Sequence, residues 1–175
     1  MHRHGGVFLF ALVSTALLSS TTLTAQQRHN VLLVMIDDLG PEYVGCYGRL
    51  PNPPATPVLD QLAASGVRFY EAIADPVCTP SRVCLQTGRH AFRVYTVMTL
   101  YVGDAGLRDE ELLLPEVLAA SGYARAMIGK WHVGDRHGGA TPNVQGWPHF
   151  IGTMYGGLND YYRWPKITNG VASTC

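Results

Sequence analysis

The sequence predicts an α/β protein, because apolar strand-like runs alternate with helix patterns along the chain. The first run, residues 30–38 (NVLLVMIDD), is almost continuously apolar, as expected of a strand buried on both faces of a parallel or mixed sheet. Two more strand-like runs, residues 67–74 (VRFYEAIA) and 123–129 (YARAMIG), follow later in the chain. A helix pattern separates each pair of neighbouring runs, which gives the alternation typical of this fold class.

Residues typical of helix starts and ends support the predicted alternation of strands and helices. In residues 55–66 (ATPVLDQLAASG), Thr56 suits an N-cap and Gly66 suits the end of a helix. Residues 112–122 (LLLPEVLAASG) end in the same way. Residues 134–175 are rich in Gly, Pro and aromatic residues and show little periodicity, so loops or short strands are expected there.

The composition indicates one exported globular domain. The chain has 175 residues, 47% of them hydrophobic and 15% charged, and its formal net charge of +0 gives no reason to expect a nucleic-acid partner. Residues 1–25 combine a basic start, an apolar run at 7–18 and a small polar end, so they are predicted to be a secretory signal peptide. The apolar run is too short for a stable membrane span, although a retained N-terminal anchor is the alternative. Residues 26–175 would then be the exported domain, periplasmic or secreted.

Asp37 and Asp38 form the first candidate site, at the end of the first predicted strand. Neighbouring strand residues point to opposite faces, so the two carboxylates can share a ligand only where the backbone turns. Gly40 and Pro41 follow at once and indicate such a turn. Paired hard oxygen ligands suit Ca²⁺ or Mg²⁺, whereas the alternative interpretation is a solvated acidic turn.

The second candidate site begins at a cysteine. The chain has four cysteines with no CxxC pair and no zinc-like spacing, too few and too scattered for a disulfide scaffold: Cys46, Cys78, Cys84 and Cys175. Cys78 and Arg82 lie four apart, on roughly one side of a helix predicted to start near Pro80. The helix N-terminus, capped by Thr79 or Ser81, and the Arg82 guanidinium would bind a tetrahedral oxyanion. The alternative is a buried structural cysteine and a surface ion pair.

The third candidate site follows the third predicted strand. In GKWHVG (residues 129–134), Lys130 and His132 point the same way if the segment is extended. A cation beside an imidazole suits oxyanion binding and proton transfer, whereas the alternative is an edge-strand lysine and a structural histidine. Since the carboxyl ends of strands gather at one edge of an α/β sheet, all three candidate sites should converge there. Three other histidines have no metal-ligand spacing and are assigned to loops or structure: His90, His137 and His149.

Together these segments resemble the type I sulfatase family, within the alkaline-phosphatase-like superfamily. The resemblance is carried, in the family's order, by NVLLVMIDDLG, TPVLDQLAASGVRFYEAIADPVCTPSR, CTPSRVCLQTGR and GYARAMIGKWHVG. It implies an α/β/α sandwich with a mostly parallel central sheet. Residues 26–175 would be the N-terminal part of its catalytic domain, incomplete at the C-terminus.

The resemblance also implies a modification and a metal ion. In this family the cysteine of C-x-P-S-R is oxidised during export to the aldehyde formylglycine, by an enzyme that reads the residues matching Cys78, Pro80 and Arg82. The aldehyde hydrate offers one hydroxyl as nucleophile and a second that later expels sulfate. Asp37, Asp38 and modified Cys78 would bind Ca²⁺, with Mg²⁺ a weaker expectation.

The remaining roles follow from the same resemblance. Arg82 would hold the hydrate, Lys130 would bind the sulfate, and His132 would orient the hydrate or accept its proton. Cys84 and Cys46 would be core residues. The expected substrate is a sulfated small molecule or carbohydrate, and the formylglycine-generating enzyme is the expected partner.

The chain departs from the family pattern after Gly134. Family members are several hundred residues long, and their later Asp-Asn pair, leaving-group acid and further lysine are not found here. Asn159 and Asp160 stand in the wrong order and setting. Two alternatives to an exported sulfatase therefore stay open. One is a non-catalytic remnant that binds a sulfated ligand through Arg82 and Lys130, and the other is a phosphonate or phosphate ester hydrolase.

Overall fold

The computed structural model describes residues 29–101, 103–108, 110–134, 142–158, 160 and 162–174. The predicted signal peptide (1–25) lies outside these residues, as do three single residues named above: His137, Asn159 and Cys175. The chain divides into two compact units, residues 1–36 and 37–175.

In the first unit, residues 29–36 contain neither helix nor strand. The prediction of a strand over residues 30–38 is therefore wrong for this structure. Its apolar side chains are exposed, Leu32 to 89%. A strand is held by hydrogen bonds to a neighbouring strand, and no strand pairs with this segment within the described chain. The apolar run alone does not create that partner.

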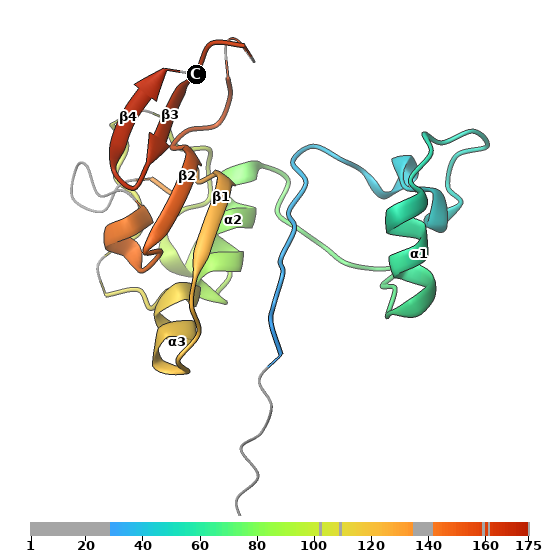
Figure 1. Cartoon of the computed structure of the whole chain (residues 1–175), viewed down its shortest axis with the longest axis horizontal. Helices are drawn as coiled ribbons and strands as arrows, with labels where there is room; N and C mark the ends of the chain where they lie inside the picture. The colour runs from blue at the N-terminus through green and yellow to red at the C-terminus, as the bar shows by residue number, and fades with distance from the viewer. Residues whose placement is uncertain are drawn as a thin grey trace, which may run out of the picture. The chain divides into compact units, whose positions relative to one another are not determined.

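The second unit begins with a turn at Asp37 and Asp38 and contains all the helices of the described chain. The three α-helices are α1 (Pro57–Ser65), α2 (Cys78–Thr87) and α3 (Leu114–Ala120) (Figure 1). Four 3₁₀ turns accompany them: η1 (Pro41–Tyr43), η2 (Gly45–Tyr47), η3 (Ala91–Val94) and η4 (Pro142–Gln145). Helices α1 and α3 confirm the two predicted helices, although Thr56, at the N-cap position of α1, makes no side-chain capping bond.

The sheet has four strands in the order β1-β2-β3-β4 (Figure 1). They are β1 (Ala126–Lys130), β2 (His149–Thr153), β3 (Pro165–Thr168) and β4 (Val171–Thr174). Strands β1 and β2 are parallel, and the other two pairs are antiparallel, so the sheet is mixed. Strand β1 confirms the third predicted strand, whereas residues 67–74 form no strand. The α/β fold class is confirmed.

The core of the second unit brings α2 together with the sheet. Its buried hydrophobic residues come from α2, η3, the segment before α3, the segment after β1, the residues that follow η4, and β2: Val83, Ala91, Val94, Leu107, Leu113, Trp131, Val133, Trp147 and Phe150. Two glycines, Gly129 and Gly152, face each other in the parallel β1–β2 pair. A Cβ at Gly152 would collide with the carbonyl oxygen of Gly129, so only a residue without a side chain fits. This close pairing positions the carboxyl end of β1, where Lys130 lies.

Candidate active site

The first turn of α2 positions Cys78 and Arg82 on one side of the helix. The helix begins at Cys78, two residues earlier than predicted. Cys78 Sγ lies 3.1 Å from His132 Nδ1, and Arg82 Nη1 donates to the carbonyl oxygen of Lys130 at 2.5 Å. Arg82 thus reaches the last residue of β1 and Cys78 reaches the segment just after it, so both point to one side of the helix, as their spacing of four predicts.

Asp37 is held by two cations. Its Oδ2 accepts hydrogen bonds from Lys130 Nζ at 2.5 Å and from Arg82 Nη2 at 3.2 Å. Arg82 is buried, and the side chain of Lys130 is largely so. Burial acts to raise the pKa of Asp37, but the hydrogen bond and charge of Lys130 and the charge of Arg82 outweigh it, so the pKa is lowered. Asp37 is therefore an ionised carboxylate that links the end of β1 to α2.

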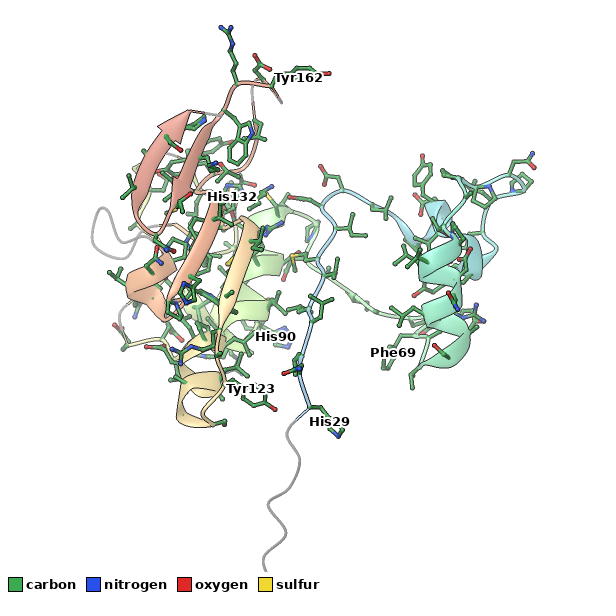
Figure 2. All side chains as sticks on the ribbon, viewed as in Figure 1. His29, Phe69, His90, Tyr123, His132 and Tyr162 are labelled. Atoms are coloured by element: carbon green, nitrogen blue, oxygen red, sulfur yellow. The ribbon has the colours of Figure 1, made fainter. Side chains whose placement is uncertain are left out.

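His132 is buried, with 1% of its surface exposed, and lies just after β1 (Figure 2). Its Nε2 is 2.8 Å from the carbonyl oxygen of Leu100. Because a carbonyl only accepts, Nε2 carries the hydrogen, and in the neutral ring Nδ1 presents its lone pair to Cys78. Burial lowers the pKa of His132, Lys130 and Arg82 lower it further, and the bond to Leu100 opposes them. The imidazole is thus a neutral proton acceptor for the group at position 78.

Lys130 and His132 do not lie in one extended segment as expected. His132 has a φ of 52°, so the backbone leaves the strand conformation after β1 and the two-residue alternation no longer applies. Lys130 instead reaches Asp37, and His132 reaches Cys78. The three candidate sites nevertheless converge at the carboxyl end of β1, as predicted.

Neither predicted cap binds the N-terminus of α2. Val77 is the N-cap and makes no side-chain capping bond. Ser81 Oγ donates to carbonyl oxygens that precede the helix in the chain, those of Asp75 and Val77. Thr79 Oγ1 instead accepts a hydrogen bond from the backbone N–H of Leu100 at 3.2 Å. The hydroxyl groups therefore connect the helix start to other segments.

The predicted metal ligands do not assemble into a metal site. Among the described residues, no group of three His, Cys, Asp or Glu side chains could hold a metal ion. Asp38 is exposed, in a left-handed conformation with φ of 54°, while Asp37 pairs with its two cations. Cys78 contacts His132. The positive charges of Arg82 and Lys130 thus neutralise Asp37 where a divalent cation was expected.

Of the two cysteines predicted to be core residues, only Cys84 packs against the described core, whereas Cys46 is half-buried and lies outside that cluster. Cys84 packs against the core, its Sγ donates to Asp75 Oδ2 at 3.1 Å, and burial raises the pKa of its thiol. Cys46, Cys78 and Cys84 are all free thiols. His90 stacks on Phe92. In the part of the chain that the structure describes, no helix has the length and apolar character to cross a membrane.

Sequence reasoning missed three contributors to the site. The Leu100 carbonyl has no sequence signature, because any residue supplies one. For Thr79 the sequence indicates only a capping role. Gly156, in the loop after β2, approaches the ring so closely that a Cβ there would lie 2.6 Å from His132 Cε1. In the sequence, the only signal for Gly156 is the glycine pair in YGG (residues 155–157).

The arrangement suits nucleophilic chemistry on an oxyanion. Position 78 lies in the first turn of a ten-residue helix, where free N–H groups favour anions. The neutral imidazole of His132 faces position 78, and the side chains of Arg82 and Lys130 supply two positive charges near the end of β1. These parts can hold a tetrahedral anion and accept a proton from an attacking group.

Comparison with known proteins agrees with this chemistry. Residues 29–171 match the sulfatase family model. Human arylsulfatase A is 42% identical over 137 residues, covering 76% of this chain and 27% of that protein. Human N-acetylgalactosamine-6-sulfatase is 41% identical over 127 residues, covering 64% and 23%. The chain therefore spans about a quarter of the length of these curated relatives.

A solved structure shows the same fold. The PsFucS1 sulfatase from Pseudoalteromonas sp. superposes with a TM-score of 0.59 at 35% sequence identity, over 69% of this chain and 25% of that chain. This likeness confirms the predicted alkaline-phosphatase-like fold, of which the described residues form a part.

Proposed function

Because the chain belongs to the sulfatase family, we propose that it forms the N-terminal part of an exported sulfuric-ester hydrolase that uses formylglycine made from Cys78. One observation carries the proposal: the first turn of α2 and the end of β1 bring Cys78, Arg82, Lys130 and His132 together. Residues 1–25 would direct export, and residues 26–175 would belong to the catalytic domain.

Position 78 suits the modified residue. A hydrated aldehyde there would supply one hydroxyl to attack sulfur and a second to expel sulfate afterwards. His132 Nδ1, 3.1 Å from the present Sγ, is placed to take a hydroxyl proton. Leu100 holds the opposite nitrogen, so the acceptor atom stays directed at position 78. The burial of His132 restricts access of bulk water to this proton transfer.

Arg82 and Lys130 would supply positive charge to the sulfate. Arg82 is anchored through Lys130 O and Asp37 and would orient the group at position 78. The Lys130 ammonium has three donors, of which the bond to Asp37 Oδ2 uses one. The others can bind a sulfate oxygen and stabilise charge that develops in the transition state.

A divalent cation, most suitably Ca²⁺, is the cofactor that we propose beside formylglycine. Asp37 and Asp38 are the carboxylates at the end of the first apolar run, and carboxylate oxygen atoms suit Ca²⁺ better than a thiol sulfur does. Because the described side chains form no group of three ligands, we assign no step to this ion.

The substrate class that we propose is a sulfated carbohydrate or small molecule. N-acetylgalactosamine-6-sulfatase, named for a sugar sulfate, is among the relatives. The formylglycine-generating enzyme would be the partner during export, reading Cys78, Pro80 and Arg82. Substrate pockets depend on loops that vary between members of one fold, so an aryl sulfate is a suitable general probe.

The test is hydrolysis of an aryl sulfate by the complete gene product, co-expressed with the modifying enzyme. We expect sulfate release by the wild type and none above background for Cys78→Ala. An aryl phosphate assayed in parallel distinguishes a phosphate ester hydrolase. If Cys78→Ala and the wild type release sulfate equally, the proposed role of Cys78 is wrong. If neither turns over but both bind the sulfate ester, the protein is a non-catalytic binder.

A further inference from the structure

We propose that Thr79 and Gly156 are positioning residues for His132, which together fix the ring so that Nδ1 faces position 78. Neither residue touches the reacting groups, and both act through the imidazole. We call the contacts of Thr79, Leu100 and Gly156 around His132 the His132 clamp. Its role in catalysis rests on the function proposed above. Its structural basis is a set of contacts around His132 that involves neither modification nor metal.

The first arm of the clamp runs through the backbone of Leu100. Thr79 Oγ1 accepts the Leu100 N–H at 3.2 Å, and the Leu100 carbonyl oxygen lies 2.8 Å from His132 Nε2. Thr79 is fully buried and directly follows Cys78 at the start of α2. The contacts therefore close a ring from Cys78 through His132 and Leu100 back to the helix. One hydroxyl sets the position of the carbonyl that determines which ring nitrogen carries the hydrogen.

The second arm is the loop after β2. The His132 backbone N–H donates to the Met154 carbonyl oxygen at 3.0 Å, which fixes this loop to the end of β1. Two residues later, a Cβ at Gly156 would lie 2.6 Å from His132 Cε1, 3.1 Å from Nε2 and 3.2 Å from Nδ1. Any side chain at Gly156 must therefore displace the imidazole or push the loop away from it. At the adjacent Gly157, a Cβ would meet nothing within 4 Å.

These geometries provide matched variants. Thr79→Val removes the hydroxyl at nearly constant shape, whereas Thr79→Ser keeps it. Gly156→Ala pushes on the ring, whereas Gly157→Ala adds the same methyl group one residue away in open space. A general loss of folding would alter the state of His132 in both variants of a pair. The proposed clamp predicts that only Thr79→Val and Gly156→Ala alter His132.

The first measurement is the ¹⁵N NMR spectrum of the imidazole in the chain with unmodified Cys78. The wild type and Thr79→Ser should show one neutral tautomer, with hydrogen on Nε2. Thr79→Val should show a mixture of the two tautomers, because the Leu100 carbonyl is no longer held. A single Nε2–H tautomer in Thr79→Val would overturn the role of Thr79.

The second measurement is alkylation of Cys78 by iodoacetamide, followed by peptide mass spectrometry. In this reaction an S–C bond forms, the C–I bond breaks, iodide leaves, and His132 Nδ1 takes the thiol proton. Thr79→Val and Gly156→Ala should slow Cys78 alkylation roughly tenfold, because a displaced base loses part of its contribution. Thr79→Ser and Gly157→Ala should stay within about twofold of the wild-type rate, and Cys46 is the internal reference thiol.

The outcomes separate this inference from the proposed function. Equal rates for Gly156→Ala and Gly157→Ala would refute the role of Gly156. Both measurements use the thiol form and no sulfate ester, so they do not depend on sulfatase activity. If the variants behave as stated while the complete protein fails to release sulfate, the positioning role of Thr79 and Gly156 is supported and the proposed function is refuted.

Discussion

Asp37 shows what a sequence pattern can and cannot indicate at the scale of a residue. Its position at the end of an apolar run predicted correctly that it would lie near the other candidate residues. Its partners were not predictable, because a carboxylate attracts a metal ion and a guanidinium alike. The structure places Arg82 and Lys130 on the same oxygen of Asp37. Charge neutralisation there depends on three segments that are distant in sequence.

His132 should make stability depend on pH. Its pKa is lowered from the ordinary value of 6.5, first by burial, so the folded state favours the neutral ring more than the unfolded chain does. Above about pH 6.5 this histidine imposes no penalty, and the free energy of unfolding should decrease as pH falls from there to the folded pKa. Urea titrations across this range should show the decrease.

A non-titrating replacement identifies the responsible group. His132→Gln should weaken this pH dependence, although it lowers stability throughout the range. His90→Gln is the control, because His90 is exposed and stacks only on Phe92 in the contacts described. An unchanged pH dependence in His132→Gln would show that another group causes it.

Backbone contacts explain why part of the site could not be predicted. The sequence indicates Cys78, Arg82, Lys130 and His132 as candidates because their side chains carry chemistry in recognisable spacing. The carbonyl that orients the imidazole belongs to Leu100, whose side chain has no part in the bond. Only the folded chain reveals which peptide groups meet the ring.

At the scale of elements, helices and strands differed in how well they could be predicted. Local sequence was sufficient to locate α1 and α3, each of which has a proline in its first turn. The apolar runs at 30–38 and 67–74 indicate segments suited to strands, but hydrogen-bonded neighbours decide whether strands form. In the described chain, β1 is hydrogen-bonded to β2, whereas residues 30–38 and 67–74 pair with no strand.

The parallel pairing of β1 with β2 should depend on Gly152. A Cβ there would meet the main chain of Gly129, which has no flexible end that could move aside. Gly152→Ala should therefore lower the free energy of unfolding by about 2 kcal/mol. Gly157→Ala, in open space, is the matched control and should unfold at nearly the wild-type urea concentration. Equal stability of both variants would mean that the two strands can separate without cost.

At the scale of the whole molecule, the exposed apolar surface is the main feature. Within the second unit, large apolar side chains are exposed on several elements, including Ile73 at 99% and Ile128 of β1 at 82%. Globular proteins seldom expose so many without a partner surface. The chain spans about a quarter of the length of its curated relatives.

This surface should bind a hydrophobic dye while the chain is folded. We expect the chain to increase the fluorescence of anilinonaphthalene sulfonate in native buffer. Ile128→Thr keeps a β-branched residue in β1 and should reduce that signal, while the free energy of unfolding changes by less than about 0.5 kcal/mol. Dye fluorescence that is absent in the wild type would show that these side chains are covered in solution.

The decisive experiment asks whether Cys78 is converted to formylglycine. The chain should be co-expressed with the formylglycine-generating enzyme, digested with trypsin, and the peptide of residues 69–82 analysed by mass spectrometry. We expect the mass of an aldehyde in place of the thiol, with Cys46 and Cys84 unmodified in their own peptides. A Cys78 that stays a thiol under these conditions would contradict the catalytic role proposed for the site.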